Sequence, residues 1–219
     1  MTSNDLQRIQ SLLCSVAADA GKFILDIYSK GTFVVRKKTD NSPVTAADIG
    51  SQELILSFLE KHFPDIPIVS EELADSANKI ATRELFFLVD PLDSTKNFVT
   101  GIPFFNISLA LVHKGLTIVG VIRDPVHEIT YGAYRGGGAT KNATPIHVRP
   151  CASLTDADLD VNATKLQEEP YRRIAFEIMP TAKKVRYFGS AVLETCWIAG
   201  GALDAVSYTH LTLPTIYSV

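Results

Sequence analysis

The segment LFFLVDPLDST, residues 85–95, joins an unbroken apolar run to two aspartates that stand three positions apart. Five consecutive apolar residues are typical of a strand that is covered on both faces of its sheet. Asp90 follows this run directly, and Pro91 stiffens the turn that leads from it to Asp93. We therefore predict that Asp90 lies near the core and that the two carboxylates converge on one small volume.

Two carboxylates held this close would repel each other and resist ionising if nothing compensated their charge. A divalent cation would remove that conflict, and hard oxygen ligands without His or Cys favour magnesium over zinc. The alternative for Asp90 and Asp93 is a solvated acidic turn that caps the following helix. The apolar run favours the metal site, because it places Asp90 away from a free surface.

Further polar residues flank this turn. Glu71 and Glu72 end a strand predicted at 66–69, so more carboxylates stand at a strand end. If a helix begins at Ser94 and Thr95, its free backbone amides form an anion site next to the acidic turn. Metal ions beside such a site suit hydrolysis of a phosphate ester, because they bring water closer to hydroxide and neutralise the departing alkoxide.

Periodicity predicts the two helices that precede this segment. Apolar residues at helical spacing predict an amphipathic helix over 3–29. Thr45, with Asp48 three residues on, is typical of a helix N-terminus. We expect the helix that follows to turn three apolar residues towards the core: Ile49, Leu56 and Leu59.

The residues after the acidic turn predict a sheet. Alternating polarity over 104–112, followed by strand patterns at 116–122 and 129–134 with short turns between them, indicates an antiparallel meander. Gly189 and Ser190 are typical of the start of a further helix.

Composition sets limits on location and partners. The chain has 219 residues, 46% of them hydrophobic and 21% charged, as in an ordinary globular protein. A net charge of -3 gives no sign of a nucleic-acid polymer held by bulk charge. Three scattered cysteines fit a reducing compartment, and the sequence shows neither a secretory signal nor an apolar run of membrane length. We therefore expect a cytoplasmic protein with no membrane partner.

Four motifs in order resemble the inositol monophosphatase superfamily, which also includes fructose-1,6-bisphosphatases and 3'(2'),5'-bisphosphate nucleotidases. The resemblance covers residues 1–206. Its motifs are Val-Thr-x-x-Asp at 44–48, Glu-Glu at 71–72, Asp-Pro-(Leu/Ile)-Asp-Gly-(Thr/Ser) at 90–95, and Gly-Ser-Ala-x-Leu at 189–193.

The resemblance implies an α+β fold, the layered α/β/α/β/α sugar-phosphatase fold, with its second half incomplete. Residues 1–150 would form an N-terminal α+β part that carries the metal and phosphate motifs, and residues 151–206 a partial C-terminal α/β part. Residues 207–219 do not resemble the family and contain no Asp, Glu, Lys or Arg. We expect this tail to be foreign, from a truncated or misassembled reading frame; a genuine β-rich terminus is the alternative.

The resemblance assigns metal ligands among the residues already singled out. Glu71, Asp90 and the backbone carbonyl of Leu92 would hold a first Mg²⁺, and Asp90 with Asp93 a second. A third ion would contact Glu71 through waters, so the expected cofactor is two or three magnesium ions. Glu72 would orient metal-bound water from outside the coordination shell.

For the reaction, the resemblance implies in-line attack by water on a small phosphorylated substrate, without a covalent phospho-enzyme. Thr95 and Asp48 would position and activate that water, and the amides of Ser94 and Thr95 would hold the phosphate. The expected substrate is a polyol or sugar phosphate, inositol monophosphate or fructose 1,6-bisphosphate. A bisphosphate nucleotidase is the alternative, because residues 40–45 look similar to those enzymes. The resemblance also implies sensitivity to lithium and a homodimer.

Two departures from the family pattern bear on activity. Ser94 stands where the family has glycine. Its side chain would crowd the phosphate, strain the backbone if this position needs a positive φ, or add a hydroxyl donor. The sequence has no Trp-Asp pair to match the family's later motif, whose Asp completes the second metal site. We therefore expect reduced phosphatase activity, and a catalytically impaired metal- or phosphate-binding fragment is a further alternative.

Overall fold

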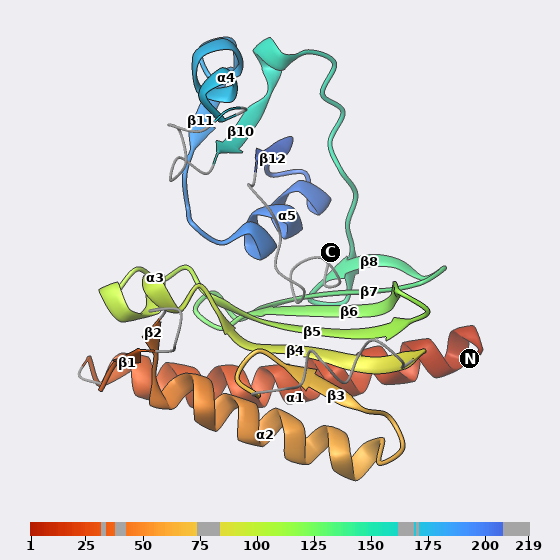
Figure 1. The fold of residues 1–219 in the computed structure, drawn as a ribbon. Coiled ribbons are helices and arrows are strands. Elements are labelled where there is room, and N and C mark those ends of the chain that lie inside the picture. The colour runs from red at the N-terminus through yellow and green to blue at the C-terminus, as the bar shows by residue number, and fades with distance from the viewer. Residues whose placement is uncertain (32–33, 38–42, 74–83, 162–168, 170, 208–219) are drawn as a thin grey trace.

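The computed structural model describes residues 1–31, 34–37, 43–73, 84–161, 169 and 171–207. Helices α1 (Ser3–Ser29) and α2 (Ala46–His62) cover one face of a seven-stranded sheet, and α5 (Ala191–Ala199) lies on its other face (Figure 1). A second, smaller sheet follows beyond α5. This arrangement confirms the expected layered α+β fold. Within the part of the chain that is described, no helix is both long and apolar enough to cross a membrane.

The strands of the large sheet follow one another in chain order, with β3 at one edge and β9 at the other. β3 and β4 are parallel, and each later pair of neighbours is antiparallel, which confirms the predicted meander. The strands are β3 (Ile68–Ser70), β4 (Leu85–Asp93), β5 (Asn106–His113), β6 (Leu116–Asp124), β7 (Ile129–Tyr134), β8 (Gly138–Lys141) and β9 (Thr144–Pro145).

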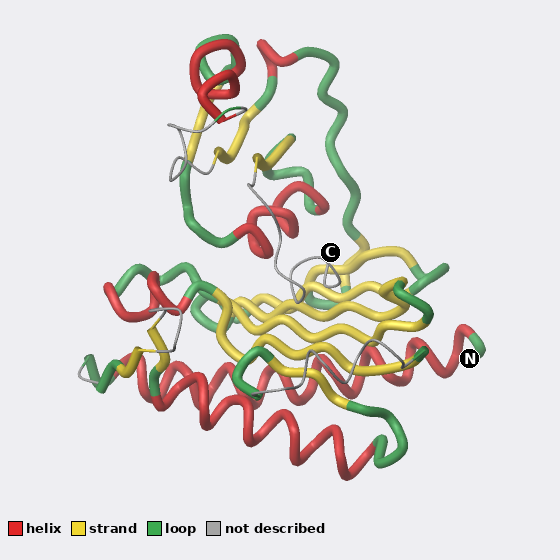
Figure 2. Tube along the Cα trace, viewed as in Figure 1, coloured by secondary structure: helices red, strands yellow, loops and turns green. Residues whose placement is uncertain are grey.

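The second sheet has three parallel strands in the order β11-β10-β12 (Figure 2). The connection from β9 to β10 contains the boundary predicted at residue 150, which stays a prediction. Ser207 pairs with Val161, so this sheet takes in the first residue of the segment predicted to be a foreign tail, while residues 208–219 lie outside the described residues. The remaining elements are β1 (Arg36–Lys37), β2 (Pro43–Val44), β10 (Asp158–Val161), β11 (Lys184–Arg186), β12 (Ala205–Ser207), α3 (Thr95–Thr100), α4 (Tyr171–Arg173), a 3₁₀ turn (Leu154–Asp156) and a π-helical turn (Ile174–Ile178).

Helix α1 has the bounds that its periodicity predicts. Thr2 caps it, because its hydroxyl accepts a hydrogen bond from the Asp5 amide while the Asp5 side chain accepts one from the Thr2 amide. The apolar stripe of α1 packs on the sheet and joins the main core cluster. The sheet contributes to this cluster the alternate side chains that the pattern at 104–112 predicts: Phe105, Ile107, Leu109 and Leu111.

Helix α2 departs from the prediction in the face that it buries. Thr45 and Asp48 form the expected N-terminal cap. The buried face of the first turns is polar, however, because it adjoins the end of β4, where the Ser51 hydroxyl donates to the Pro91 carbonyl at 3.0 Å. The spacing of the apolar residues therefore predicted the wrong buried face for the first turns of this helix. Of the three predicted core residues, Leu59 is buried, Leu56 is half-buried and Ile49 is 39% exposed.

Candidate active site

The acidic cluster forms where two parallel strands end together. In the pairing of β3 with β4, Ser70 lies opposite Val89. The Glu71 amide extends this pairing by donating to the Val89 carbonyl at 3.1 Å. Because parallel strands end at the same edge of a sheet, Glu71 and Asp90 leave the sheet side by side.

Asp90 is buried, with 4% of its surface exposed. Its Oδ1 accepts a hydrogen bond from the Leu92 amide at 3.2 Å, and its carboxyl group contacts that of Glu71. Burial raises the pKa of Asp90 well above its usual value, and the negative charges of Glu71 and Asp93 raise it further. A cation at this edge would stabilise the ionised forms of Asp90 and Asp93.

Asp93 lies after an irregularity in the pairing of β4 with β5 and is opposite Asn106. Its Oδ2 accepts hydrogen bonds from the Asn106 side-chain amide and from the Ser190 hydroxyl, both at 2.6 Å. Burial raises the pKa of Asp93, and these hydrogen bonds oppose the rise. The direction of the Asp93 carboxylate is thus set from the start of α5 as well as from the sheet.

The carboxylates form an open edge rather than a closed cage. No three His, Cys, Asp or Glu side chains within the described ranges are grouped as ready-made metal ligands. Asn106 and Ser190 both donate to one oxygen of Asp93, Oδ2. Glu71 is exposed and Glu72 half-buried in the turn after β3.

Asp48 and Thr95 meet at this edge, although different helices carry them. The Thr95 hydroxyl lies 3.1 Å from Asp48 Oδ1 and 3.1 Å from the Leu92 carbonyl, and it donates its single hydrogen to one of them. Asp48 is 1% exposed, and its Oδ2 accepts from the amide and the hydroxyl of Thr45, both at 2.7 Å. Burial raises the pKa of Asp48, while these hydrogen bonds lower it. A buried carboxylate of this kind is a suitable proton acceptor.

Ser94 shows two of the effects expected of a serine in place of glycine: a strained backbone and an added hydroxyl donor. Its backbone is left-handed, with φ 66° and ψ 44°, a conformation that costs a residue with a side chain about 1 kcal/mol. Its hydroxyl also donates to the Gly189 carbonyl at 2.8 Å. The side chain therefore links the acidic turn to the start of α5.

Two residues of the site were not predicted from the sequence. Ser190 was expected only to start a helix, which it does by accepting a hydrogen bond from the Leu193 amide at 3.4 Å. Asn106 belongs to the segment at 104–112, whose alternating polarity predicted only a strand. Neither pattern indicated that both side chains would meet at Asp93.

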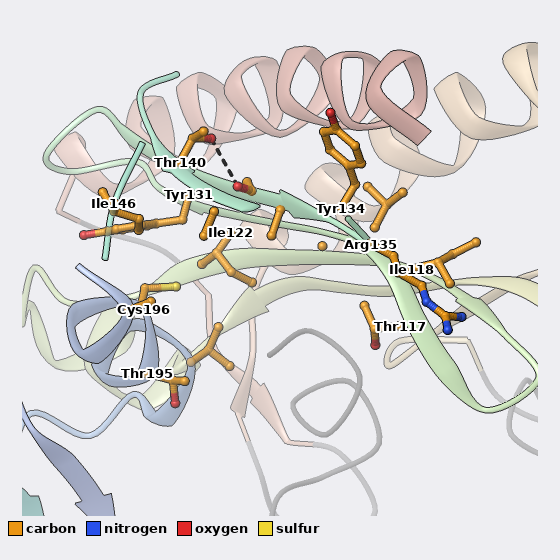
Figure 3. A pocket seen from close by; sticks show the side chains of 17 residues that line it. Thr117, Ile118, Ile122, Tyr131, Tyr134, Arg135, Thr140, Ile146, Thr195 and Cys196 are labelled. Carbon is orange, nitrogen blue, oxygen red and sulfur yellow. Dashed lines mark hydrogen bonds between the residues drawn. The ribbon is translucent and has the colours of Figure 1, made fainter. Parts of the chain in front are cut away.

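The structure also has a cavity of about 300 Å³ (Figure 3). It lies between α5 and the face of β6, β7 and β8 that α1 does not cover, and its lining is mostly apolar. Ile122, Tyr131 and Cys196 are among the lining residues, and none of the predicted site residues is.

Comparison with known proteins identifies relatives. The model of the Inositol monophosphatase family matches residues 5–212. The chain is 34% identical to Nus factor SuhB of Pasteurella multocida over 171 residues, which cover 76% of the chain and 63% of that protein. It is 32% identical to Inositol monophosphatase 1 of Solanum lycopersicum over 197 residues, covering 86% and 72%. It is 40% identical to the 3'(2'),5'-bisphosphate nucleotidase CysQ of Shigella flexneri over 126 residues, covering 57% and 51%.

Solved structures with similar folds include proteins of the same kinds. The extragenic suppressor protein SuhB of Bartonella henselae superposes with a TM-score of 0.86 at 27% identity, over 96% of this chain and 82% of that one. An IMPase/NADP phosphatase complexed with Mg²⁺ and phosphate superposes with a TM-score of 0.78 at 25% identity, over 91% and 74%. The chain therefore belongs to the inositol monophosphatase family, a family of metal-dependent phosphoric monoester hydrolases.

Proposed function

We propose that this chain is a magnesium-dependent phosphomonoesterase that hydrolyses a small phosphorylated polyol or sugar, such as inositol monophosphate or fructose 1,6-bisphosphate. The observation that carries the proposal is an acidic strand edge beside a hydroxyl–carboxylate pair. Glu71 and Asp90 form the edge, and Thr95 and Asp48 form the pair. The Leu92 carbonyl lies within hydrogen-bonding distance of the Thr95 hydroxyl and so connects the two.

The groups at this edge suit Mg²⁺, because they are all oxygen donors: the carboxylates of Glu71, Asp90 and Asp93, and the carbonyl of Leu92. The raised pKa of Asp90 supports the assignment, since Glu71 and Asp93 add negative charge around it. We assign two or three ions to this edge, with Glu72 orienting coordinated water. When bound, magnesium lowers the pKa of coordinated water and offsets the charge of a phosphate ester.

Thr95 and Asp48 would handle the proton of the attacking water. With the Thr95 hydroxyl donating its hydrogen to Asp48 rather than to the Leu92 carbonyl, the lone pairs of its oxygen would be available to accept a hydrogen bond from water. The water proton would pass to the Thr95 oxygen as the hydroxyl proton passes to Asp48, which leaves hydroxide and a neutral Asp48. The raised pKa of Asp48 favours that transfer.

The amides of Ser94 and Thr95 are the proposed donors to the phosphate. Helix α3 begins at Thr95, so the amides at its start have no acceptor within the helix. The left-handed turn at Ser94 separates Asp93 from α3 by one residue, which keeps these amides next to the acidic edge. A phosphate held there would lie beside the metal ligands and Thr95.

Phosphate release from three compounds tests the proposal: inositol 1-phosphate, fructose 1,6-bisphosphate and 3'-phosphoadenosine 5'-phosphate. Each is assayed with Mg²⁺ and with a chelator. We expect hydrolysis of the first or the second compound, and we expect the chelator to abolish it. Absence of release from all three in the presence of Mg²⁺ contradicts the proposal.

A bisphosphate nucleotidase is the second candidate, and the 40% identity to CysQ over 126 residues favours it. Preferential hydrolysis of 3'-phosphoadenosine 5'-phosphate would establish it. The third candidate is an impaired metal- or phosphate-binding protein. Calorimetric binding of Mg²⁺ and phosphate without turnover of any compound would identify that case.

We also propose a homodimer, inhibition by lithium and a cytoplasmic location, with no nucleic-acid polymer as partner. The cysteines Cys14, Cys151 and Cys196 are free thiols, which supports a reducing compartment. The net charge of -3 supports the absence of a nucleic-acid partner. Light scattering measures the oligomeric state, and assays with added lithium chloride measure the inhibition.

A further inference from the structure

The turn at residues 188–190 joins the second sheet to the acidic edge. Three oxygen atoms of this turn, two carbonyls and one hydroxyl, are hydrogen-bonded to Asp93, Ser94 and the α3 residue Asn97. The Asn97 side-chain amide donates to the Phe188 carbonyl at 3.0 Å, the Ser94 hydroxyl donates to the Gly189 carbonyl at 2.8 Å, and the Ser190 hydroxyl donates to Asp93 at 2.6 Å.

The backbone amides of the same turn donate to two other carboxyl groups. The Phe188 amide donates to Asp160 Oδ2 at 3.1 Å. The Gly189 and Ser190 amides donate to Glu194 Oε1 at 2.9 and 3.0 Å. Successive amides that converge on acidic groups form an anion-binding nest. The turn is therefore held between the acidic edge and a second pair of carboxyl groups.

This second pair is deeply buried. Asp160 on β10 is 1% exposed and Glu194 on α5 is 0% exposed, and the two carboxyl groups contact each other. Within the described residues, Asp160 Oδ1 and Glu194 Oε2 accept no hydrogen bond, so one shared proton would satisfy the pair. Burial raises the pKa of Glu194 to about 8, and the charge of Asp160 contributes to the rise. Among the residues that the structure describes, Arg186 and Tyr187 also face the pair.

We propose that Asp160 and Glu194 are positioning residues, which fix the turn at 188–190 and through the Ser190 hydroxyl set the direction of the Asp93 carboxylate. The proposal rests on the proposed function, because it treats Asp93 as part of the active site. Burying two acidic groups in contact is costly. The backbone amides of the turn at 188–190 offset part of this cost by donating hydrogen bonds to Asp160 and Glu194. Because Ser190 of the same turn donates to Asp93, the buried pair is connected to the active site.

The alternative is that Glu194 only stabilises the start of α5. Glu194→Gln separates the two roles, because glutamine retains an oxygen for the two amides and gains a donor for Asp160. It keeps the turn in place but removes the titrating proton. Asp160→Asn also removes the titrating proton, by changing the other member of the pair. Asp124→Asn is the matched control, since Asp124 is also buried but binds the His127 amide instead.

The reporter is the side-chain amide of Asn106, which donates to both Asp93 and Ser190. Its NMR resonances are followed in the metal-free chain between about pH 6 and pH 10. We expect a step near pH 8 in the wild type and in Asp124→Asn that is lost in Glu194→Gln and Asp160→Asn, whereas any step that comes from Asp90 or Asp93 is common to all four proteins. A step near pH 8 of equal size in Glu194→Gln and the wild type, or flat Asn106 resonances in the wild type, overturns the proposal.

A second measurement is the affinity for Mg²⁺ by calorimetry near neutral pH. We expect Glu194→Gln to bind within about twofold of the wild type and Glu194→Ala to bind about tenfold more weakly. Equal affinity in Glu194→Ala and the wild type counts against a positioning role. Failure of the wild type itself to bind Mg²⁺ defeats the proposed function, and the metal-free NMR titration still decides the role of Glu194.

Discussion

The Thr95 hydroxyl lies within hydrogen-bonding distance of the Asp48 carboxylate, at 3.1 Å, although 47 positions of sequence separate the two residues. The contact forms because α2 begins beside the end of β4, from which the chain turns into α3. It places a hydroxyl that can accept a hydrogen bond from water against a buried proton acceptor. This relationship is the part of the site that separates a hydrolase from a simple cation-binding edge.

Removing that hydroxyl should therefore affect turnover far more than folding. We expect Thr95→Ala to lower kcat about 100-fold or more and to lower the free energy of unfolding by only about 1 kcal/mol, the net value of one hydrogen bond. Thr95→Ser retains the hydroxyl and should keep most of the activity. Steady-state kinetics and urea unfolding measure the two effects, and wild-type kcat in Thr95→Ala would refute the role.

Ser94 gives a test of stability. Ser94→Ala keeps the left-handed strain but loses the hydrogen bond to Gly189, so its free energy of unfolding should fall by about 1 kcal/mol. Ser94→Gly loses the same hydrogen bond but relieves about 1 kcal/mol of strain, and it should stay near the wild type. Urea unfolding of the three proteins measures the difference. Equal stability of the two variants would show that the backbone at this position is not strained.

Glu194 should make stability depend on pH. Its pKa is about 8 in the folded chain, against 4.5 for an unperturbed glutamate, so between these two values the native state holds a proton that the unfolded chain has released. The unfolding free energy of the wild type should therefore fall as pH rises from about 4.5 to about 8. Glu194→Gln should show a shallower fall, and Asp124→Asn should keep the wild-type dependence. Urea unfolding between about pH 4.5 and pH 8 measures this dependence. If the unfolding free energy changed equally with pH in Glu194→Gln and the wild type, titration of Glu194 would be excluded as its cause.

The sequence predicted those parts of the structure that depend on local signals. Apolar residues at helical spacing predicted α1, and alternating polarity predicted the meander. The step from apolar residues to Asp90 correctly indicated a buried carboxylate at a strand end, because a strand covered on both faces must bury the residue that follows it.

The parts that escaped prediction depend on contacts between distant segments. Ile49 looked like a core residue, but the face of α2 that adjoins the site is polar, so apolar spacing pointed to the wrong side. Ser190 is 97 positions from Asp93, and a serine at a helix start carries no sign of a partner so distant. The sequence also did not predict the buried contact between Asp160 and Glu194. Asp and Glu side chains are exposed in most proteins, and only the fold brings these two together.

Calorimetric titration of Mg²⁺ into the full chain tests the central claim most directly, namely that carboxylates from the ends of β3 and β4 share a hard cation. We predict binding that weakens about tenfold or more in Asp90→Asn and stays unchanged in Asp19→Asn, an exposed carboxylate on α1. Equal affinity for Mg²⁺ in the wild type and in Asp90→Asn would contradict the account.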